Sequence, residues 1–284
     1  MIALRVLEPY KDDLGNEIIY DGDPLDQRID IKFFGKNNRL VVAPNAKIVE
    51  LEVEFGGNGS TAEIMPTSKP RTGLRFGLRL GQASRIHIGE NVGSQGRTMV
   101  SAVEGTEVHI GDDCMLASGI EIRTDDSHPI YSVRTGKRVN SSRSISIGDH
   151  VWIAKHAVIM GGVQVGSGSV VGFRSIVTSN VPNNCVAVGA PARVVRRDIA
   201  WERPMVTARQ PGDDVPGRGE KNERFWNLTR GGEQIVVAPV KRRTAWKKRI
   251  GKFVPRSLRP AARRMTRRAE ATVAHVAHAL RRGN

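Results

Sequence analysis

Residues 145–181 read ISIGDHVWIAKHAVIMGGVQVGSGSVVGFRSIVTSNV, and their spacing decides the fold class. An aliphatic residue recurs at every sixth position without a slip in register: Ile147, Ile153, Ile159, Val165, Val171 and Val177. The residue four positions after each of these is small or β-branched, and glycine directly follows three of them. An amphipathic helix has a period of 3.6 and a hairpin strand a period of 2, so neither explains a period of six.

A short strand followed by a turn does explain it. If each hexad forms one flat side of a triangular coil, three hexads close a turn, the aliphatic side chains stack inward, and glycine relieves the crowded corners. We therefore predict an all-β fold, a parallel β-helix. Broken hexads at Ile110, Leu116 and Ile122 and around residues 88–92 extend the pattern toward the N-terminus, and residues 39–65 read as imperfect starting coils.

The repeat is interrupted once, between Ile122 and Ile147. The intervening residues 123–146, RTDDSHPIYSVRTGKRVNSSRSIS, are polar and contain Thr-Gly and Ser-Ser pairs, which is typical of a loop. A loop that leaves a rigid solenoid is a common place for function. We therefore expect an extruded functional loop here.

Composition limits the class of protein. The chain has 284 residues, of which 39% are hydrophobic and 26% charged, as in soluble globular proteins. It has no run of 18 apolar residues, and its first 20 residues contain acids where a secretory signal needs an apolar core, so we expect a cytoplasmic protein. Cys114 and Cys185 have no CxxC partner, which indicates neither a disulfide framework nor a zinc knuckle.

The net charge of +15 lies almost entirely at one end of the chain. Residues 241–284 hold 15 Lys or Arg and a single acid, Glu270, whereas the rest of the chain is close to neutral. Aromatic and aliphatic residues are interleaved with these bases, which is typical of an amphipathic, partly helical anchor for an anionic membrane surface, peripheral on its inner face. A solvated tail and a subunit-packing helix remain alternatives, and nothing in the tail is suited to reading nucleic acid bases.

Together these features resemble the hexapeptide-repeat acyltransferases, and among them the bacterial surface-polysaccharide O-acetyltransferases. The resemblance runs from about Asn37 to Arg203 and rests on DDSHPIYSVRTGKRVN, on the hexads quoted above and on VAVGAPARVVRR. It implies a left-handed coil, a homotrimer with active sites between subunits, and acetyl-CoA as donor. We therefore expect an N-terminal segment (1–36), a β-helix domain (37–203) with a catalytic loop (123–146), a linker (204–240) and a basic tail (241–284).

The resemblance places the loop histidine of this family at His128. Acyl transfer to a hydroxyl requires removal of the hydroxyl proton, and an imidazole with a pKa of ~6.5 suits that task. Asp125 and Asp126 lie immediately upstream, where either carboxylate could orient the ring. The alternative is a solvated loop histidine between ordinary loop acids.

The donor site is also carried over from the resemblance. Trp152 should point outward, because an indole is costly to bury inside a narrow coil, and in this family it lies against the acetyl-CoA arm. Arginine forks suit phosphate geometry, and Arg193 and Arg196 match the arginines that meet the coenzyme phosphates. By register, further donor contacts fall on Ser118, Lys155, Phe173, Thr178 and Ser179. The sequence departs from the family pattern at Ala154, Phe173–Arg174 and Thr178–Asn180, and a bulky Phe173 would narrow the groove.

These residues predict an O-acetyltransferase that moves acetyl from acetyl-CoA to a hydroxyl of a surface polysaccharide or of its lipid-linked or sugar precursor. An amino-sugar N-acetyltransferase, a small-acceptor acetyltransferase and a non-catalytic β-helix scaffold are the alternatives. His150 and His156 lie six residues apart and raise a zinc alternative, with His87 or His109 as the third ligand. Exposed edge histidines are the simpler interpretation, and we expect no metal.

Overall fold

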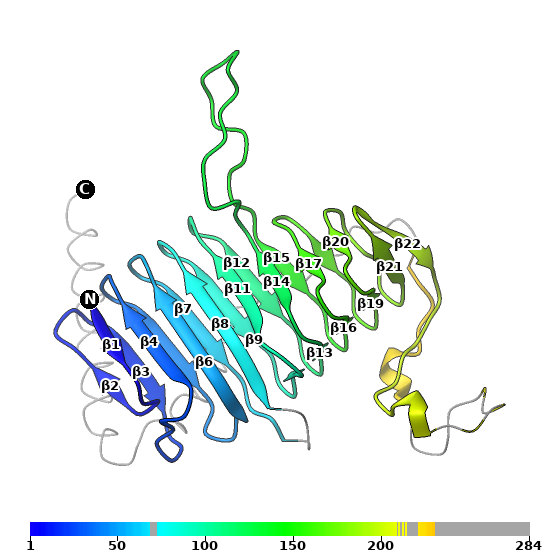
Figure 1. The fold of residues 1–284 in the computed structure, drawn as a ribbon, viewed down its shortest axis with the longest axis horizontal. Coiled ribbons are helices and arrows are strands. Elements are labelled where there is room, and N and C mark those ends of the chain that lie inside the picture. Colours follow the sequence, from blue (N-terminus) through cyan, green and yellow to red (C-terminus); the bar gives the residue numbers. More distant parts are fainter. Residues whose placement is uncertain (69–72, 209, 211, 213, 215–220, 231–284) are drawn as a thin grey trace, which may run out of the picture. The chain divides into compact units, whose positions relative to one another are not determined.

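The computed structural model describes residues 1–68, 73–208, 210, 212, 214 and 221–230. The chain winds into a solenoid whose successive turns pair in parallel (Figure 1). Each early turn contributes one strand to each of two sheets, and from β10 onward the turns also contribute to a third sheet. The predicted parallel β-helix is thus confirmed.

The described strands fall into three sheets. Sheet 1 contains, in spatial order, β1 (Ile2–Leu4), β4 (Ile29–Phe33), β6 (Ile48–Phe55), β8 (Leu74–Leu80), β11 (Thr98–Ala102), β14 (Ile120–Arg123), β17 (Val158–Ile159) and β20 (Ile176–Val177). Sheet 2 contains β10 (Gly93–Ser94), β13 (Met115–Leu116), β16 (Trp152–Ile153), β19 (Val170–Val171), β21 (Val186–Gly189) and β22 (Ala192–Arg196). Sheet 3 contains β18 (Gln164–Val165), β15 (Ile145–Ile147), β12 (Glu107–Ile110), β9 (Arg85–Ile88), β7 (Thr61–Ile64), β5 (Arg39–Val42), β3 (Glu17–Tyr20) and β2 (Tyr10–Lys11).

The hexads of residues 145–181 form the coils that their spacing predicts. Ile147 pairs with Val165, Ile153 with Val171 and Ile159 with Val177, so that each side of the triangle repeats after eighteen residues. All six aliphatic residues are buried. The residues four positions later also face inward or fill the corners, as Val151, Ala157 and Ser169 do.

The earlier coils are longer than three hexads. Ile29 pairs with Leu51 and Phe76 with Thr98, in each case a separation of 22 residues. These coils have strands of up to eight residues, and they enclose a larger core in which the rings of Phe33 and Phe55 stack 5.0 Å apart. Ile110, Leu116 and Ile122 point inward as predicted, but within these wider coils.

The solenoid begins before residue 37, the boundary expected from the sequence. Strand β3 pairs in parallel with β5, and β4 pairs in parallel with β6. Residues 1–36 therefore continue the first coils rather than form a separate segment. The hexad pattern does not reveal them because their strands are spaced for a 22-residue turn.

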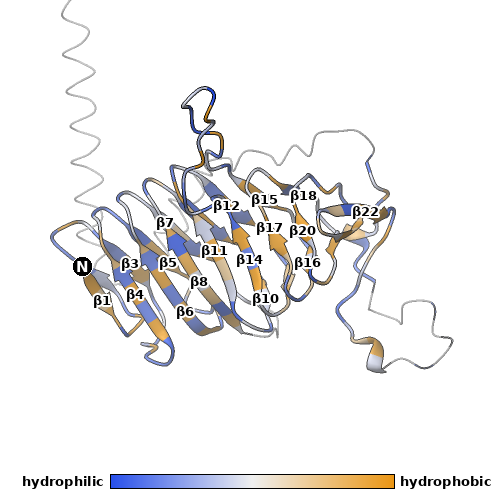
Figure 2. Cartoon of the chain, turned by 45° about the horizontal axis from the view of Figure 1, so that its top comes forward, coloured by the Kyte–Doolittle hydropathy of each residue, from blue (hydrophilic) through white to orange (hydrophobic). Residues whose placement is uncertain are grey.

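Hydropathy alternates along the strands, as expected where one face is buried and the other is wet (Figure 2). In β6 the side chains of Leu51, Val53 and Phe55 are fully buried, and the glutamates between them face outward. The core is therefore a column of inward side chains that runs through all the coils.

Antiparallel strands lie at the ends of the stack. At the N-terminal end β1 pairs antiparallel with β4, and β2 pairs antiparallel with β3. At the C-terminal end β22 folds back antiparallel on β21 through the cis Ala190–Pro191 peptide bond.

The segment after the coils docks back on the corner between sheets 3 and 2. The ring of His150 is sandwiched between Trp201, 4.1 Å away, and Phe225, 4.5 Å away. Its Nδ1 lies 2.8 Å from the Asp113 carboxylate, and the Trp201 indole N–H donates to the His150 carbonyl. His150 is buried rather than exposed at an edge, because residues from the following segment, Phe225 among them, cover it.

Two 3₁₀ turns, η1 (Val206–Ala208) and η2 (Glu223–Phe225), lie in this segment. The predicted basic tail at 241–284 and part of the linker fall outside the described residues, so the tail's role as a membrane anchor stays a prediction. Among the helices in the described ranges, none has the length and apolar character needed to cross a bilayer.

The outer face of sheet 3 carries two stacked imidazoles. The rings of His87 and His109 lie 4.9 Å apart and nearly parallel, and His87 Nδ1 lies 3.1 Å from the Glu63 carboxylate. Burial, together with the charge of the neighbouring His87, lowers the pKa of His109 to about 4. His109 is therefore neutral in the folded protein at neutral pH.

The inward column should dominate stability. Ile153→Ala removes a fully buried side chain from the middle of the narrow coils, and we expect it to lower the free energy of unfolding by about 2–5 kcal/mol. Leu228→Ala, at a 78% exposed aliphatic outside the loop, serves as the control and should change it by less than about 0.5 kcal/mol. Equilibrium denaturation measures both, and equal losses would contradict the assignment of the core.

The neutral His109 should make stability depend on pH. The unfolded chain takes up a proton on this histidine near pH ~6.5, whereas the folded chain does so only near pH 4, so stability is lost as the pH falls between these values. We expect the free energy of unfolding of the wild type to fall by about 1–3 kcal/mol more than that of His109→Gln over this range. Chemical denaturation at stepped pH tests this. His128→Gln, at an exposed histidine, should track the wild type.

Candidate active site

The loop of residues 124–144 leaves the solenoid at the corner between sheets 1 and 3, where β14 ends and β15 begins (Figure 1). It doubles back on itself, because Tyr131 and Arg138 form an antiparallel bridge and the Val139 N–H donates to the Ile130 carbonyl. The turn at its tip is closed by hydrogen bonds to the carbonyls of Ser132 and Lys137. The loop predicted from composition is therefore an ordered hairpin that stands off the coils.

Glu104, on the preceding coil, anchors the returning strand of the loop. Its carboxylate accepts hydrogen bonds from the Arg138 guanidinium and, at 2.6 Å, from the Ser142 hydroxyl. These hydrogen bonds lower the pKa of Glu104 to about 2. The anchor therefore remains ionised at any ordinary pH.

Asp125 anchors the outgoing strand. Its buried carboxylate accepts hydrogen bonds from the Ser101 hydroxyl at 2.6 Å and from the Ser127 N–H at 2.8 Å. Burial acts to raise the pKa of Asp125, but the hydrogen bonds and the nearby Arg123 outweigh it and hold the pKa below its usual value. Asp125 thus ties the loop to β11.

Asn140 joins the two strands of the loop beside His128. Its side-chain amide donates to the Asp126 carboxylate at 3.0 Å and to the His128 carbonyl at 2.9 Å, while its Oδ1 accepts from the Ile130 N–H at 2.7 Å. One side chain therefore holds the Asp126 carboxylate before His128 and the backbone after it. No sequence pattern indicates this role, since the contact spans twelve residues of an irregular loop.

His128 itself is exposed, and its backbone N–H donates to the Asp126 carbonyl at 2.8 Å. Among the described residues its ring makes no hydrogen bond, and neither Asp125 nor Asp126 contacts it. Within this chain the two aspartates therefore stabilise the conformation of the loop. The imidazole of His128 remains exposed to solvent.

Three of the expected donor residues lie together on the corner between sheets 2 and 1. Ser118, Lys155 and Phe173 occupy equivalent positions on successive coils, since the His156 N–H donates to the Ser118 carbonyl and the Arg174 N–H to the Lys155 carbonyl. Phe173 is 59% exposed, so its ring projects into solvent beside this row.

Trp152 lies next to this row, on β16. Its side chain points outward and is 36% exposed, as the cost of burying it inside the coil predicts. Its ring lies 6.0 Å from that of Trp201, which is itself stacked on His150. The docked C-terminal segment therefore supports Trp152 from one side, a contact that the sequence did not indicate.

The other expected donor residues lie elsewhere on the chain. Thr178 and Ser179 directly follow β20 at the corner between sheets 1 and 3, which is also the corner that carries the loop. Arg193 and Arg196 lie on β22, and both are exposed. Within a single chain the structure thus divides the expected donor residues between two corners and the terminal hairpin.

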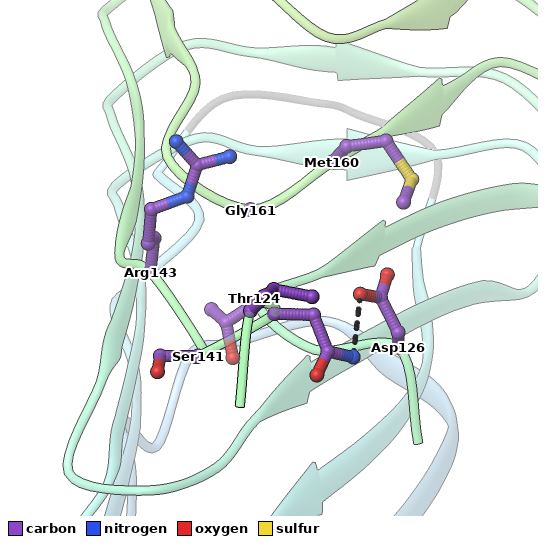
Figure 3. Close-up of a pocket in the computed structure, with 8 residues that line it drawn as sticks. Thr124, Asp126, Ser141, Arg143, Met160 and Gly161 are labelled. Atoms are coloured by element: carbon purple, nitrogen blue, oxygen red, sulfur yellow. Dashed lines mark hydrogen bonds between the residues drawn. The ribbon is translucent and has the colours of Figure 1, made fainter. Parts of the chain in front are cut away.

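A pocket of about 440 Å³ lies at the base of the loop (Figure 3). It is lined by Thr124, Asp126, Val139, Asn140, Ser141, Arg143, Met160 and Gly161. These residues come from both strands of the loop and from the turn after β17. The pocket therefore lies between the hairpin that carries His128 and the coils.

The histidines considered as zinc ligands are not brought together. His87 and His109 lie on the face of sheet 3, His150 is buried at the corner between sheets 3 and 2, and His156 lies on the corner between sheets 2 and 1. Nowhere in the described part of the chain do three or more His, Cys, Asp or Glu side chains form a group that could hold a metal ion.

Comparison with known proteins relates this architecture to a family. The family model for bacterial transferase hexapeptide repeats matches residues 144–179. A polysialic acid O-acetyltransferase from Neisseria meningitidis is 33% identical over 193 residues, which is 68% of this chain and 88% of that protein. The galactoside O-acetyltransferase of Escherichia coli K12 is 38% identical over 113 residues, or 40% of this chain and 54% of that protein.

Structural comparison agrees. The crystal structure of a polysialic acid O-acetyltransferase matches with a TM-score of 0.51 and 30% identity, over 63% of this chain and 84% of that one. This neighbour supplies the hand of the coil, which pairing register alone does not fix. The stacked hexads, the inserted loop and these matches together show that the chain belongs to the hexapeptide-repeat O-acetyltransferases, which fold as left-handed parallel β-helices.

Proposed function

We propose that this enzyme transfers an acetyl group from acetyl-CoA to a hydroxyl of a surface polysaccharide or its precursor, with His128 as general base. The observation that carries the proposal is an imidazole held open on an ordered hairpin, in a chain that covers 88% of a relative named for O-acetylation of polysialic acid. The lipopolysaccharide O-acetyltransferase-like protein of E. coli K12, 30% identical over 177 residues, supports the same class of acceptor.

In the proposed reaction a sugar hydroxyl donates its proton to the free ring nitrogen of His128 as its oxygen attacks the acetyl carbon. The new C–O bond forms, the thioester C–S bond breaks, and the coenzyme leaves as a thiolate. The imidazolium then returns the proton to this thiolate, so that the enzyme ends in its starting state. No covalent bond to the protein is required.

Loop anchoring supports this role, because a general base is effective only within hydrogen-bond reach of the hydroxyl. Asn140 fixes the backbone around His128, and Asp125 and Glu104 fix the two strands to the coils. In this proposal the aspartates position the loop rather than orient the ring. Asn140 is the positioning residue closest to the base.

The donor would lie along the solenoid rather than on the loop. Trp152 offers an exposed indole for the pantetheine arm, beside the row of Ser118, Lys155 and Phe173. Arg193 and Arg196 are exposed on β22, where they would meet the phosphates. Thr178 and Ser179 lie at the corner that carries the loop.

A homotrimer would unite these parts. The hairpin stands off its own coils and exposes apolar side chains, with Ile130 53% and Val133 101% exposed. A neighbouring subunit would cover these side chains and bring its own donor row opposite His128. We therefore propose that each active site combines His128 of one subunit with Trp152 of the next.

His128→Ala and Trp152→Ala should fail in different ways. Loss of the base should lower kcat by about 10²- to 10⁴-fold with little change in the KM for acetyl-CoA. Loss of the indole should raise the KM for acetyl-CoA more than it lowers kcat, because contact area is removed rather than a proton acceptor. Thiol release with a polysaccharide acceptor measures both, with His87→Gln as the histidine control. Unchanged turnover in folded His128→Ala would remove the catalytic assignment.

Subunit mixing tests the shared site. At acetyl-CoA concentrations well below the KM of Trp152→Ala, each variant alone should be nearly inactive. Trimers refolded from His128→Ala and Trp152→Ala subunits should then regain part of the wild-type rate, since some sites receive both intact residues. Light scattering should show a trimer throughout. A fully active monomer, or trimers that show no recovery on mixing, would place both residues in one subunit's site.

A further inference from the structure

The pocket at the loop base contains an arginine that the proposed reaction does not use. Arg143 is exposed, and among the described residues its guanidinium has neither a hydrogen-bond nor an ion-pair partner. The other arginines that flank the loop are different. Arg123 pairs with Glu121 at 2.9 Å, and Arg138 pairs with Glu104. The unpaired guanidinium of Arg143 is therefore available to bind a ligand.

The guanidinium of Arg143 packs over the turn that contains Gly162. A Cβ on Gly162 would lie 2.9 Å from its Cζ, and Gly162 itself has a φ of +88°. Only glycine provides both this backbone conformation and the space in which the planar guanidinium packs. The backbone of Arg143 is also fixed, because its backbone N–H donates to the Thr124 carbonyl and its backbone carbonyl accepts from the Gly162 N–H. The Arg143 side chain therefore lies directly over the turn that contains Gly162.

The opposite side of the pocket has a different character. Figure 3 shows Asp126 and Arg143 on opposite sides, with Met160 on the side of Asp126. The Asp126 carboxylate is oriented by the amide of Asn140 and accepts hydrogen bonds, as sugar hydroxyls provide. The pocket thus places a cation at one end and a hydroxyl acceptor at the other.

We propose that this pocket binds an acidic sugar unit of the acceptor, with its carboxylate on Arg143 and its hydroxyls toward Asp126. The proposal rests on the function proposed above and names the class of acceptor, an anionic glycan. A guanidinium matches a carboxylate with two parallel hydrogen bonds. His128 follows Asp126 by two residues on the same strand of the hairpin, and in this proposal it acts on a hydroxyl of the sugar seated here.

A phosphate of the donor is the other source of an anion for Arg143. The pocket favours the carboxylate, because a phosphate group of higher charge would be repelled more strongly by the Asp126 side chain across the pocket. The sugar also satisfies both ends of the pocket at once. The two sources make different kinetic predictions.

Binding measured without donor tests the proposal independently of catalysis. Titration calorimetry would compare a sialic acid oligomer with the same oligomer after its carboxylates have been reduced to alcohols. We expect the wild type to prefer the acidic oligomer by about 10- to 100-fold, and Arg143→Gln to lose this preference. Arg143→Lys, which keeps the charge but not the fork, should retain part of it. Arg134→Gln, at the exposed turn of the same loop, should bind like the wild type.

Two results would overturn the proposal: a wild type with no preference for the acidic oligomer, or a preference that survives in Arg143→Gln. An increase in the KM for acetyl-CoA in Arg143→Gln, with acceptor binding unchanged, would assign the arginine to the donor instead. Acetyl transfer to no glycan at all would defeat the proposed function, and the calorimetric comparison would still decide whether Arg143 recognises the acid.

Discussion

Every coil of this protein depends on its neighbours, because no single turn can bury its own inward side chains or satisfy its own strand hydrogen bonds. The aliphatic residues that pair across coils, such as Ile153 with Val171, are covered only when the next turn is in place. The backbone follows the same rule, since the Trp152 N–H donates to the Ser169 carbonyl on the following coil. Stability is therefore a property of the stack.

The loop leaves the stack without disturbing the pairing register of the coils, because β14 and β17 pair across the insertion as neighbouring strands do elsewhere.

The regular part of the fold could be predicted from sequence because its signal is local and repeated. A period of six identifies the inward position in each hexad, and the one interruption locates the loop. The wider N-terminal coils were harder to define, since strands of different lengths give the 22-residue turn no fixed pattern of hexads. His150 was interpreted as an exposed edge residue because Trp201 and Phe225, which cover it, follow it by 51 and 75 residues and carry no motif.

In the candidate site, too, the residues within recognisable motifs could be predicted and those held by distant contacts could not. His128 and Trp152 could be named because the resemblance fixes them within recognisable strings, whereas the side chains that hold His128 could not. Glu104 contacts residues more than thirty positions away, and Asn140 acts through three hydrogen bonds to an irregular backbone. The aspartates illustrate the limit most clearly. Adjacency in sequence suggested that they serve the imidazole, but Asp125 turns inward to Ser101 and Asp126 turns to Asn140.

The antiparallel strands at the two ends have a consequence for behaviour at high concentration. A parallel solenoid that stopped abruptly would offer a complete edge of unpaired N–H and C=O groups, and a second molecule could continue the stack from it. Here β1 and β2 reverse direction over the first coil, and β22 reverses over the last turn of sheet 2, with Ala192 of β22 buried against the core. A reversed strand is out of step with the parallel pattern that the next molecule would have to extend. The reversed strands thus discourage end-to-end stacking at the N-terminal coil and at the C-terminal edge of sheet 2, whereas β20 and β18 remain the parallel end strands of sheets 1 and 3.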